Sequence, residues 1–323
     1  MAVGAVPAIT VGLSAGHGVF SSTHWLGIPI ALLGAVLLAV GTIFQGRGVA
    51  ARGAQETRFR RLVRRPVWAV GTSLIGGAIL LQLAALRFSP LMVVQPIGAS
   101  ALIVTVLANV RLSRQLPSRR QTLAIILCVA GIAAFVGIAS LTAQDVDISD
   151  SHLRTILIVL AFAVVGAVVA SARNRTHPSA ALSTAAAGIL YGFVATLVKT
   201  VLGRMAQGNF SWLSLAGLVG MGVAVVMGAR LVQKAHAGGS DELVVAGLTV
   251  VDPLTAVTLG IVVLGEADAA PPQAWAGFVA AGAAAVAGVW FMATSRGPEQ
   301  RAGRKGHGSP DRAQPDGPHG SRG

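Results

Sequence analysis

The stretch LVVAGLTVVDPLTAVTLGIVVL, residues 243–264, decides the class of this protein. It has the roughly 20 apolar residues needed to cross a bilayer, and its one charged residue is Asp252, near the middle. A carboxylate at that depth costs about 2.5–3.5 kcal/mol on insertion scales and marks a candidate functional site. Protonation and a hydrogen bond to another helix would give it a purely structural role. The stretch therefore predicts a membrane helix, with Asp252 as the leading candidate for function.

Similar segments recur along the whole chain. Of the 323 residues, 54% are hydrophobic and 11% are charged, against about 25% charged in soluble domains. Eight further apolar segments lie at 26–45, 67–86, 91–111, 121–141, 154–172, 181–202, 212–231 and 273–293. They lack the alternation of β-barrel strands. We therefore predict an all-α polytopic membrane protein with about nine transmembrane helices, or ten if residues 2–20 form a weak extra span.

The basic residues predict the orientation of these helices. All but four of the 25 lysines and arginines lie in the loops after the first, third, fifth and seventh segments or in the tail. The four exceptions are Arg87, Arg154, Lys199 and Arg204. Because basic loops stay in the cytoplasm, the C-terminus is predicted to be cytoplasmic. The same rule explains the net charge of +13 without a nucleic-acid partner.

Two proline-containing segments resemble each other. Val93-Val94-Gln95-Pro96-Ile97 belongs to the third segment, and Val250-Val251-Asp252-Pro253-Leu254 belongs to the eighth, which runs in the opposite direction. Inverted repeats with interrupted helices at matching positions are typical of secondary transporters. We predict four regions: an N-terminal segment (1–25), a first transmembrane half (26–141), a second half (142–293) and a disordered basic tail (294–323).

The two prolines have a mechanical consequence. Each lacks an N–H group, so Pro96 frees the carbonyl of Met92 and Pro253 frees that of Thr249. In lipid, a freed carbonyl needs a partner from a neighbouring helix or a wet cavity. We predict helix breaks at Pro96 and Pro253 that line a cavity; simple kinks remain the alternative.

Other polar side chains also fall within the apolar segments. Gln45, Gln82, Gln95 and Tyr191 could line a substrate or ion pathway, or could join helices by hydrogen bonds. Lys199 lies some 8 or 9 residues, about 12 Å, nearer the outer face than Asp252. We therefore expect Lys199 to extend to the interface and not to pair with Asp252, although it remains a pathway candidate.

The remaining signals are weaker. Glu266, at the outer end of the eighth segment, is expected to need no partner except solvent. Gly188 and Gly192 form a small-residue face that could pack within the monomer or across a homodimer. Cys128 is expected to be a small buried hydrophobe. Because no catalytic constellation is visible, we predict neither an enzyme nor a cofactor.

One stretch is similar to a known family. FSPLMVVQPIGA, residues 88–99, resembles a motif of the NIPA-like proteins in the drug/metabolite transporter (DMT) superfamily, which includes the EamA family. Residues 41–48, residues 188–199 with their closing lysine, and residues 251–254 look like further parts of that pattern. The resemblance implies a transporter fold of two inverted halves. It implies magnesium as a substrate because eukaryotic NIPA members are associated with Mg2+ transport.

Two positions differ from the family pattern. Arg114-Gln115-Leu116-Pro117 stands where relatives usually have an acidic residue, and Asp252 stands where NIPA proteins often have a neutral one. The sequence is therefore compatible with three functions. The first is transport of Mg2+ or another divalent cation around Asp252, with Asp252 as a transient metal ligand. The second is proton-coupled export of a small metabolite or drug, and the third is a non-transporting membrane scaffold.

The expected environment follows from these assignments. The partners would be the lipid bilayer, a small ion or metabolite, and in one arrangement a second copy of the chain. The excess of arginine over lysine, together with the many alanines and glycines, indicates a bacterial source and hence the plasma membrane.

Overall fold

The computed structural model describes residues 24–50, 66–113, 119–144, 146–173, 179–238 and 241–294. Within these ranges every regular element is a helix. The possible span at 2–20, most of the basic tail and most of the arginine-rich first loop lie outside the described residues.

The helices follow the predicted segments closely. Their bounds are α1 (His24–Ala50), α3 (Pro66–Phe88), α4 (Leu91–Ala99), α5 (Ala101–Ser113), α6 (Arg119–Thr142), α7 (Asp150–Arg173), α8 (Ala180–Ala206), α9 (Trp212–Gly238), α10 (Asp241–Val262) and α11 (Pro272–Thr294). In the part of the chain that the structure describes, nine stretches are long and apolar enough to cross a membrane, with α4 and α5 together making one of them. The prediction of a polytopic helical membrane protein is confirmed at this level.

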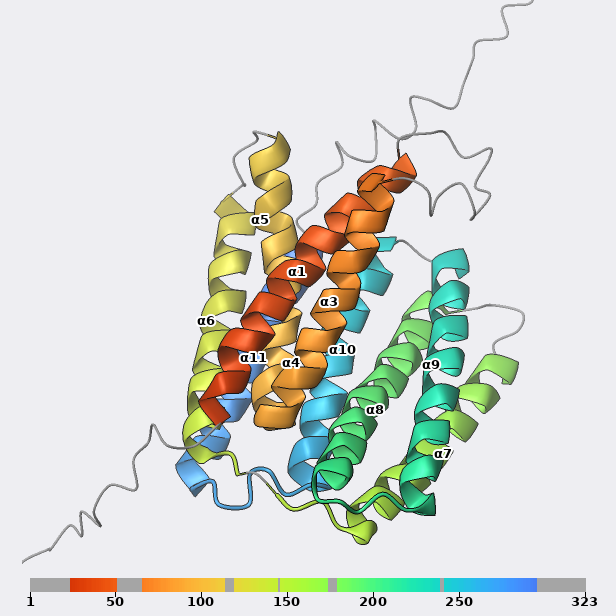
Figure 1. Cartoon of the computed structure of the whole chain (residues 1–323). Helices are drawn as coiled ribbons and strands as arrows, with labels where there is room; N and C mark the ends of the chain where they lie inside the picture. Colours follow the sequence, from red (N-terminus) through yellow and green to blue (C-terminus); the bar gives the residue numbers. More distant parts are fainter. Residues whose placement is uncertain are drawn as a thin grey trace, which may run out of the picture.

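Successive spans run in alternating directions through one bundle (Figure 1). The bundle has two ends. We call the end where α3, α6, α8 and α10 finish and α4, α7, α9 and α11 begin the Glu266 end, because that residue follows α10 there. Much of the outer surface is apolar: Leu80, Phe162 and Val279 are each about 70% exposed. Lipid would cover such a surface in a membrane.

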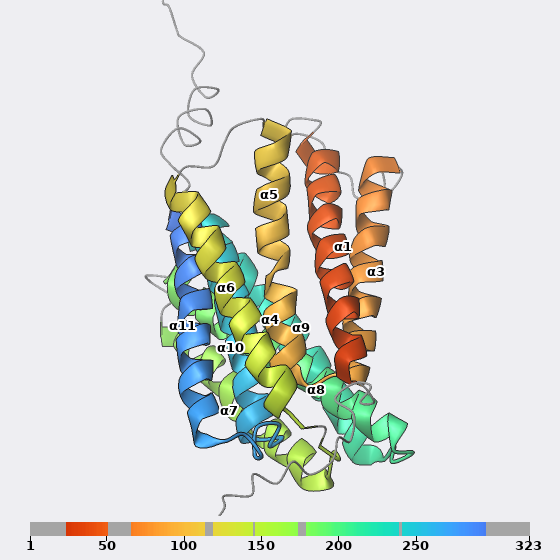
Figure 2. The same ribbon diagram turned by 90° about the vertical axis from the view of Figure 1, so that its left-hand side faces the viewer.

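The third span is divided, but the eighth is not. α4 ends at Ala99 and α5 begins at Ala101, and Figure 2 shows the two helices following one another along the bundle. Ser100 lies at the division, and its N–H and hydroxyl both donate to the carbonyl of Ile97, at 3.0 and 2.6 Å. The division thus comes four residues after Pro96. α10 continues through Pro253, so the break expected there is a missing hydrogen bond inside a continuous helix.

Glycines allow close helix crossings at two places in the bundle. A Cβ atom added at Gly41 of α1 would lie 2.9 Å from the carbonyl oxygen of Gly71 in α3. One added at Gly131 of α6 would lie 2.5 Å from the backbone nitrogen of Ala285 in α11. Small residues allow this backbone approach, which helps to drive helix association inside membranes. These crossings place α1 directly on α3 and α6 directly on α11.

Candidate functional site

A cavity lies between α4, α6, α10 and α11. We call it the proline cavity, and its lining residues are Pro96, Ala99, Cys128, Ile132, Phe135, Thr249, Val250, Pro253, Leu254, Val257, Gly282, Ala285, Val286 and Val289. It contains about 520 Å3 of empty space, including the part at its open side. Its walls are almost entirely aliphatic and aromatic, so it suits an apolar group better than a bare ion.

Pro96 and Pro253 both line this one cavity. Pro96 comes from α4 and Pro253 from α10, two helices that are in contact although far apart in sequence. Thr249, whose carbonyl loses its helical donor because Pro253 has no N–H, lines the same space. A freed carbonyl beside a cavity can bind a ligand or a water molecule. The structure therefore brings Pro96 and Pro253 to one cavity, although only the span that contains Pro96 is divided.

Asp252 lies beside the cavity and does not line it. Its backbone packs against α8: a Cβ atom at Gly188 would lie 3.3 Å from the Asp252 nitrogen, and one at Gly192 would lie 2.9 Å from the Asp252 carbonyl oxygen. The small-residue face of α8 thus packs within the monomer, against α10. The Asp252 Oδ1 atom is buried and has no hydrogen-bond partner among the described residues. Because unpaired buried carboxylate oxygens are costly, this atom is a candidate for binding a proton or a cation.

The other predicted pathway residues occupy different surroundings. Gln95, one residue before Pro96, is buried in α4. The Gln82 side chain lies against the backbone of Gly98, where an added Cβ atom would be 3.6 Å from its amide nitrogen. Gln45 donates to the hydroxyl of Thr72 at 3.3 Å and so joins α1 to α3. The structural role is therefore supported for Gln45.

Tyr191 packs on α9. A Cβ atom added at Gly228 would lie 2.9 Å from its ring carbon Cε1, so the ring fills the gap that this glycine leaves. Tyr191 immediately precedes Gly192, the residue that touches the Asp252 carbonyl. This position keeps Tyr191 in the neighbourhood of α10 without making it a wall of the proline cavity.

Lys199 and Glu266 differ from their sequence-based expectations. The Lys199 ammonium donates to the carbonyl of Ser89 at 3.0 Å, so it is held at the α3–α4 junction instead of only extending to the interface. Glu266 is 2% exposed, so the expectation that it needs only solvent is wrong. Its carboxylate accepts hydrogen bonds from the backbone N–H groups of Leu91 (2.8 Å) and Met92 (3.0 Å). These partners come from distant parts of the chain, which a single sequence does not reveal.

A buried arginine was also missed by the sequence analysis. Arg204 is fully buried at the end of α8. Its guanidinium donates to Asp150 at 2.6 Å, to Ser214 at 3.0 Å and to Ser211 at 3.1 Å. The set ties α8 to the starts of α7 and α9. Each of the three guanidinium nitrogens donates to a protein group, so we regard this cluster as structural.

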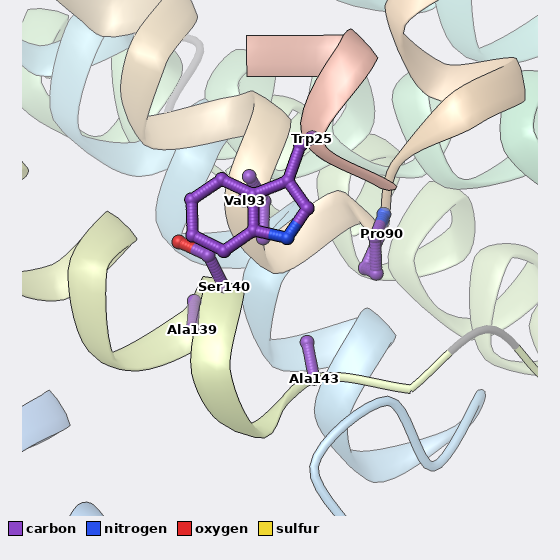
Figure 3. A pocket seen from close by; sticks show the side chains of 6 residues that line it. All are labelled: Trp25, Pro90, Val93, Ala139, Ser140 and Ala143. Atoms are coloured by element: carbon purple, nitrogen blue, oxygen red, sulfur yellow. The ribbon is translucent and has the colours of Figure 1, made fainter. Parts of the chain in front are cut away.

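A smaller pocket lies at the Glu266 end. Figure 3 shows Trp25, at the start of α1, with Pro90 and Val93 near the start of α4 and Ala139, Ser140 and Ala143 near the end of α6. The Ser140 hydroxyl donates to the carbonyl of Val136, so it already has a partner. The pocket is far smaller than the proline cavity and offers no charged side chain.

No metal cluster is preformed in the described part of the chain. Among the residues that the structure describes, no group of three or more His, Cys, Asp or Glu side chains is placed to hold a metal ion. Cys128 is fully buried, as expected of a small hydrophobe, and it lies on the cavity wall. A cation bound near Asp252 would therefore depend on one carboxylate, backbone carbonyls and water.

The chain is similar to an uncharacterized protein of Corynebacterium glutamicum. The two are 28% identical over 256 residues, which cover 76% of this chain and 86% of the relative. No protein-family model matches the sequence, and no solved structure matches the chain. Because the relative's name states no activity, function has to be argued from the geometry of this chain.

Proposed function

We propose that this integral membrane protein is a secondary transporter whose substrate occupies the proline cavity. One observation carries the proposal: the proline-bearing helices α4 and α10 wall the same cavity, and a buried, unpartnered carboxylate oxygen lies one residue away on Asp252. Unsatisfied polar groups at this depth are costly, and a transport cycle that binds and releases a proton or a ligand gives them a use.

The arrangement of the helices supports alternating access. α1 packs on α3 and α8 on α9, while α4 contacts α10 and α6 contacts α11. The set of spans from α1 to α6 and the set from α8 to α11 have opposite orientations, because one further span, α7, lies between them (Figure 1). The first span of one set thus runs opposite to the first span of the other. Two opposed sets of this kind, of the DMT type that the sequence resembles, would rock about the α4–α10 and α6–α11 contacts around a central site.

The cavity walls favour a small organic solute as the cargo. Ile132, Phe135, Val257 and their neighbours offer apolar surface, which holds the body of a ligand while a few polar groups orient it. Asp252 would alternate between a proton and a cationic or polar group of the solute. This is the proton-coupled exporter of a small metabolite or drug.

Magnesium is the second candidate, and the unpartnered Oδ1 of Asp252 favours it. Mg2+ binds through one or two carboxylates and keeps several of its waters. Asp252 together with the freed carbonyl of Thr249 could supply two oxygens, and water would supply the rest. The apolar walls count against this cargo because a hydrated ion gains little from them.

Proteoliposomes that contain the full chain test both cargoes. A lumenal indicator would report Mg2+ entry, and ethidium, an apolar organic cation, would report pH-driven solute uptake. Asp252→Asn removes the unpartnered carboxylate, whereas Asp268→Asn makes the same chemical change at an exposed position. We expect ethidium uptake that follows the pH gradient, is lost in Asp252→Asn and is unchanged in Asp268→Asn.

The other outcomes separate the alternatives. Mg2+ entry without ethidium uptake, again lost in Asp252→Asn, would favour the cation transporter. Flux of neither probe above empty liposomes, in protein shown to be folded, would refute both cargoes and favour the non-transporting scaffold.

A further inference from the structure

Glu266 occupies an unusual position for a loop carboxylate. α10 ends at Val262, and Gly265 then turns the chain with φ of 73°. This turn directs the Glu266 side chain into the bundle, where both carboxylate oxygens accept backbone hydrogen bonds from the first residues of α4. Helix N-termini have unpaired N–H groups and a positive dipole, so they stabilise a carboxylate. These charge-assisted bonds are among the stronger hydrogen bonds in proteins.

The backbone of Glu266 makes two further contacts. Its N–H donates to the carbonyl of Gly260 at 3.0 Å, and its carbonyl accepts from the N–H of Gln144 at 2.9 Å. Gly260 leaves room for the carboxylate, since a Cβ atom there would lie 2.7 Å from the Glu266 Oε2 atom. One residue thus joins the end of α10, the start of α4 and the segment after α6.

Two of these joined elements, α4 and α10, are walls of the proline cavity. α4 and α10 carry the two prolines, and at the Glu266 end their separation would break both hydrogen bonds to the carboxylate. The Lys199 contact to the Ser89 carbonyl holds α8 to the same junction. Opening toward this end is therefore opposed until water or another group satisfies the freed Glu266 and the start of α4.

We propose that Glu266 is a latch that holds the proline cavity closed toward the Glu266 end and releases when the cavity opens in that direction. The inference rests on the proposed function in one respect, because a latch presupposes a cavity that opens alternately to the two sides. The latch adds a named residue, Glu266, that sets the balance between the state open to the Glu266 end and the state open to the other end. Weakening the latch would shift that balance without changing the cavity walls.

Cys128 can report when the proline cavity opens. It is the single cysteine of the chain, fully buried in the described structure and part of the cavity wall. A membrane-impermeant methanethiosulfonate added to one side of the membrane would modify Cys128 only when the cavity opens to that side. Intact cells and inside-out vesicles present the two sides separately. Asp268→Cys, in a Cys128→Ala background, identifies the side on which the Glu266 end lies.

Two variants release the latch by different means. Glu266→Gln replaces one acceptor oxygen by an N–H2 donor that faces the donors of α4. Gly260→Ala keeps Glu266 but places a methyl group against its carboxylate. Asp268→Asn, two residues further on and exposed, is the matched control. Losing a hydrogen bond to a charged group shifts an equilibrium by about tenfold or more, here the equilibrium between the closed and open cavity. In both variants the reagent should therefore modify Cys128 from the Glu266 side at least about tenfold faster than in the wild type.

In these two variants the rate of Cys128 modification from the opposite side should match the wild-type rate within about twofold. In Asp268→Asn the rates from both sides should match the wild-type rates within the same limit. Wild-type labelling rates in folded Glu266→Gln and Gly260→Ala proteins would overturn the latch, even if transport is intact. Faster labelling without flux of either transport probe would keep the latch and reject only the tested cargoes. Cys128 that resists modification from both sides in every variant would contradict the latch and the alternating cavity together.

Discussion

Gly131→Ala is a sharp test of how the bundle is held together. A Cβ atom at Gly131 would lie 2.5 Å from the nitrogen and 2.9 Å from the Cα atom of Ala285, and 2.8 Å from the carbonyl oxygen of Ala281. All three atoms belong to the backbone of α11, so no side chain can rotate away. Carbon contacts are optimal at about 3.5–4.0 Å, so α6 and α11 would have to separate by about 1 Å. Overpacking of this kind costs about 1–3 kcal/mol.

Gly137 provides the control on the same helix. It is exposed, and an added Cβ atom would meet nothing within 4 Å. Replacing a helical glycine by alanine without a clash gains about 0.5–1 kcal/mol. Gly131→Ala should therefore be less stable than Gly137→Ala by about 1.5–4 kcal/mol, the sum of the two effects. The free energy of unfolding would be measured by titrating micellar protein with dodecyl sulfate and recording circular dichroism. Equal stabilities, or a more stable Gly131→Ala, would refute the close α6–α11 crossing.

Three further predictions concern single residues. Arg204→Lys keeps the charge but loses the forked contacts to Asp150, Ser211 and Ser214, so the free energy of unfolding should fall by about 1–3 kcal/mol in the same titration. Gly265→Ala forces a side chain into a left-handed backbone position and should cost about 1–2 kcal/mol; unchanged stability would contradict the described turn. Asp252→Asn removes an unpartnered carboxylate, so it should be as stable as the wild type, or more stable by up to about 3 kcal/mol. A clear loss of stability in that variant would show that Asp252 has a structural partner.

The helices could be predicted from the sequence because their signal is local. Apolar length alone located the spans, and the structure places α3 at Pro66–Phe88 where 67–86 was expected. Pro96 and Pro253 were predicted to face a cavity, and both line one, but the helix break predicted at Pro253 is absent because α10 continues through it.

The polar contacts could not be predicted because they join distant residues. Glu266 is hydrogen-bonded to residues more than 170 positions earlier in the chain, and neither segment indicates its partner. The division at Ser100 was likewise missed, since Pro96 marks where a hydrogen bond is lost and not where the helix axis is interrupted. Sequence patterns thus located the helices better than the polar contacts between them.

α7 makes few contacts, but it affects the orientation with which the later helices enter the membrane. It contacts chiefly α8 and α9, at the edge of the bundle. Among the described residues, four spans, from α1 to α6, precede it and four, from α8 to α11, follow it. Since four is an even number, the second set would enter the membrane in the same sense as the first if α7 were deleted. The insertion of α7 during synthesis therefore decides whether the two sets of spans have opposite orientations in the membrane.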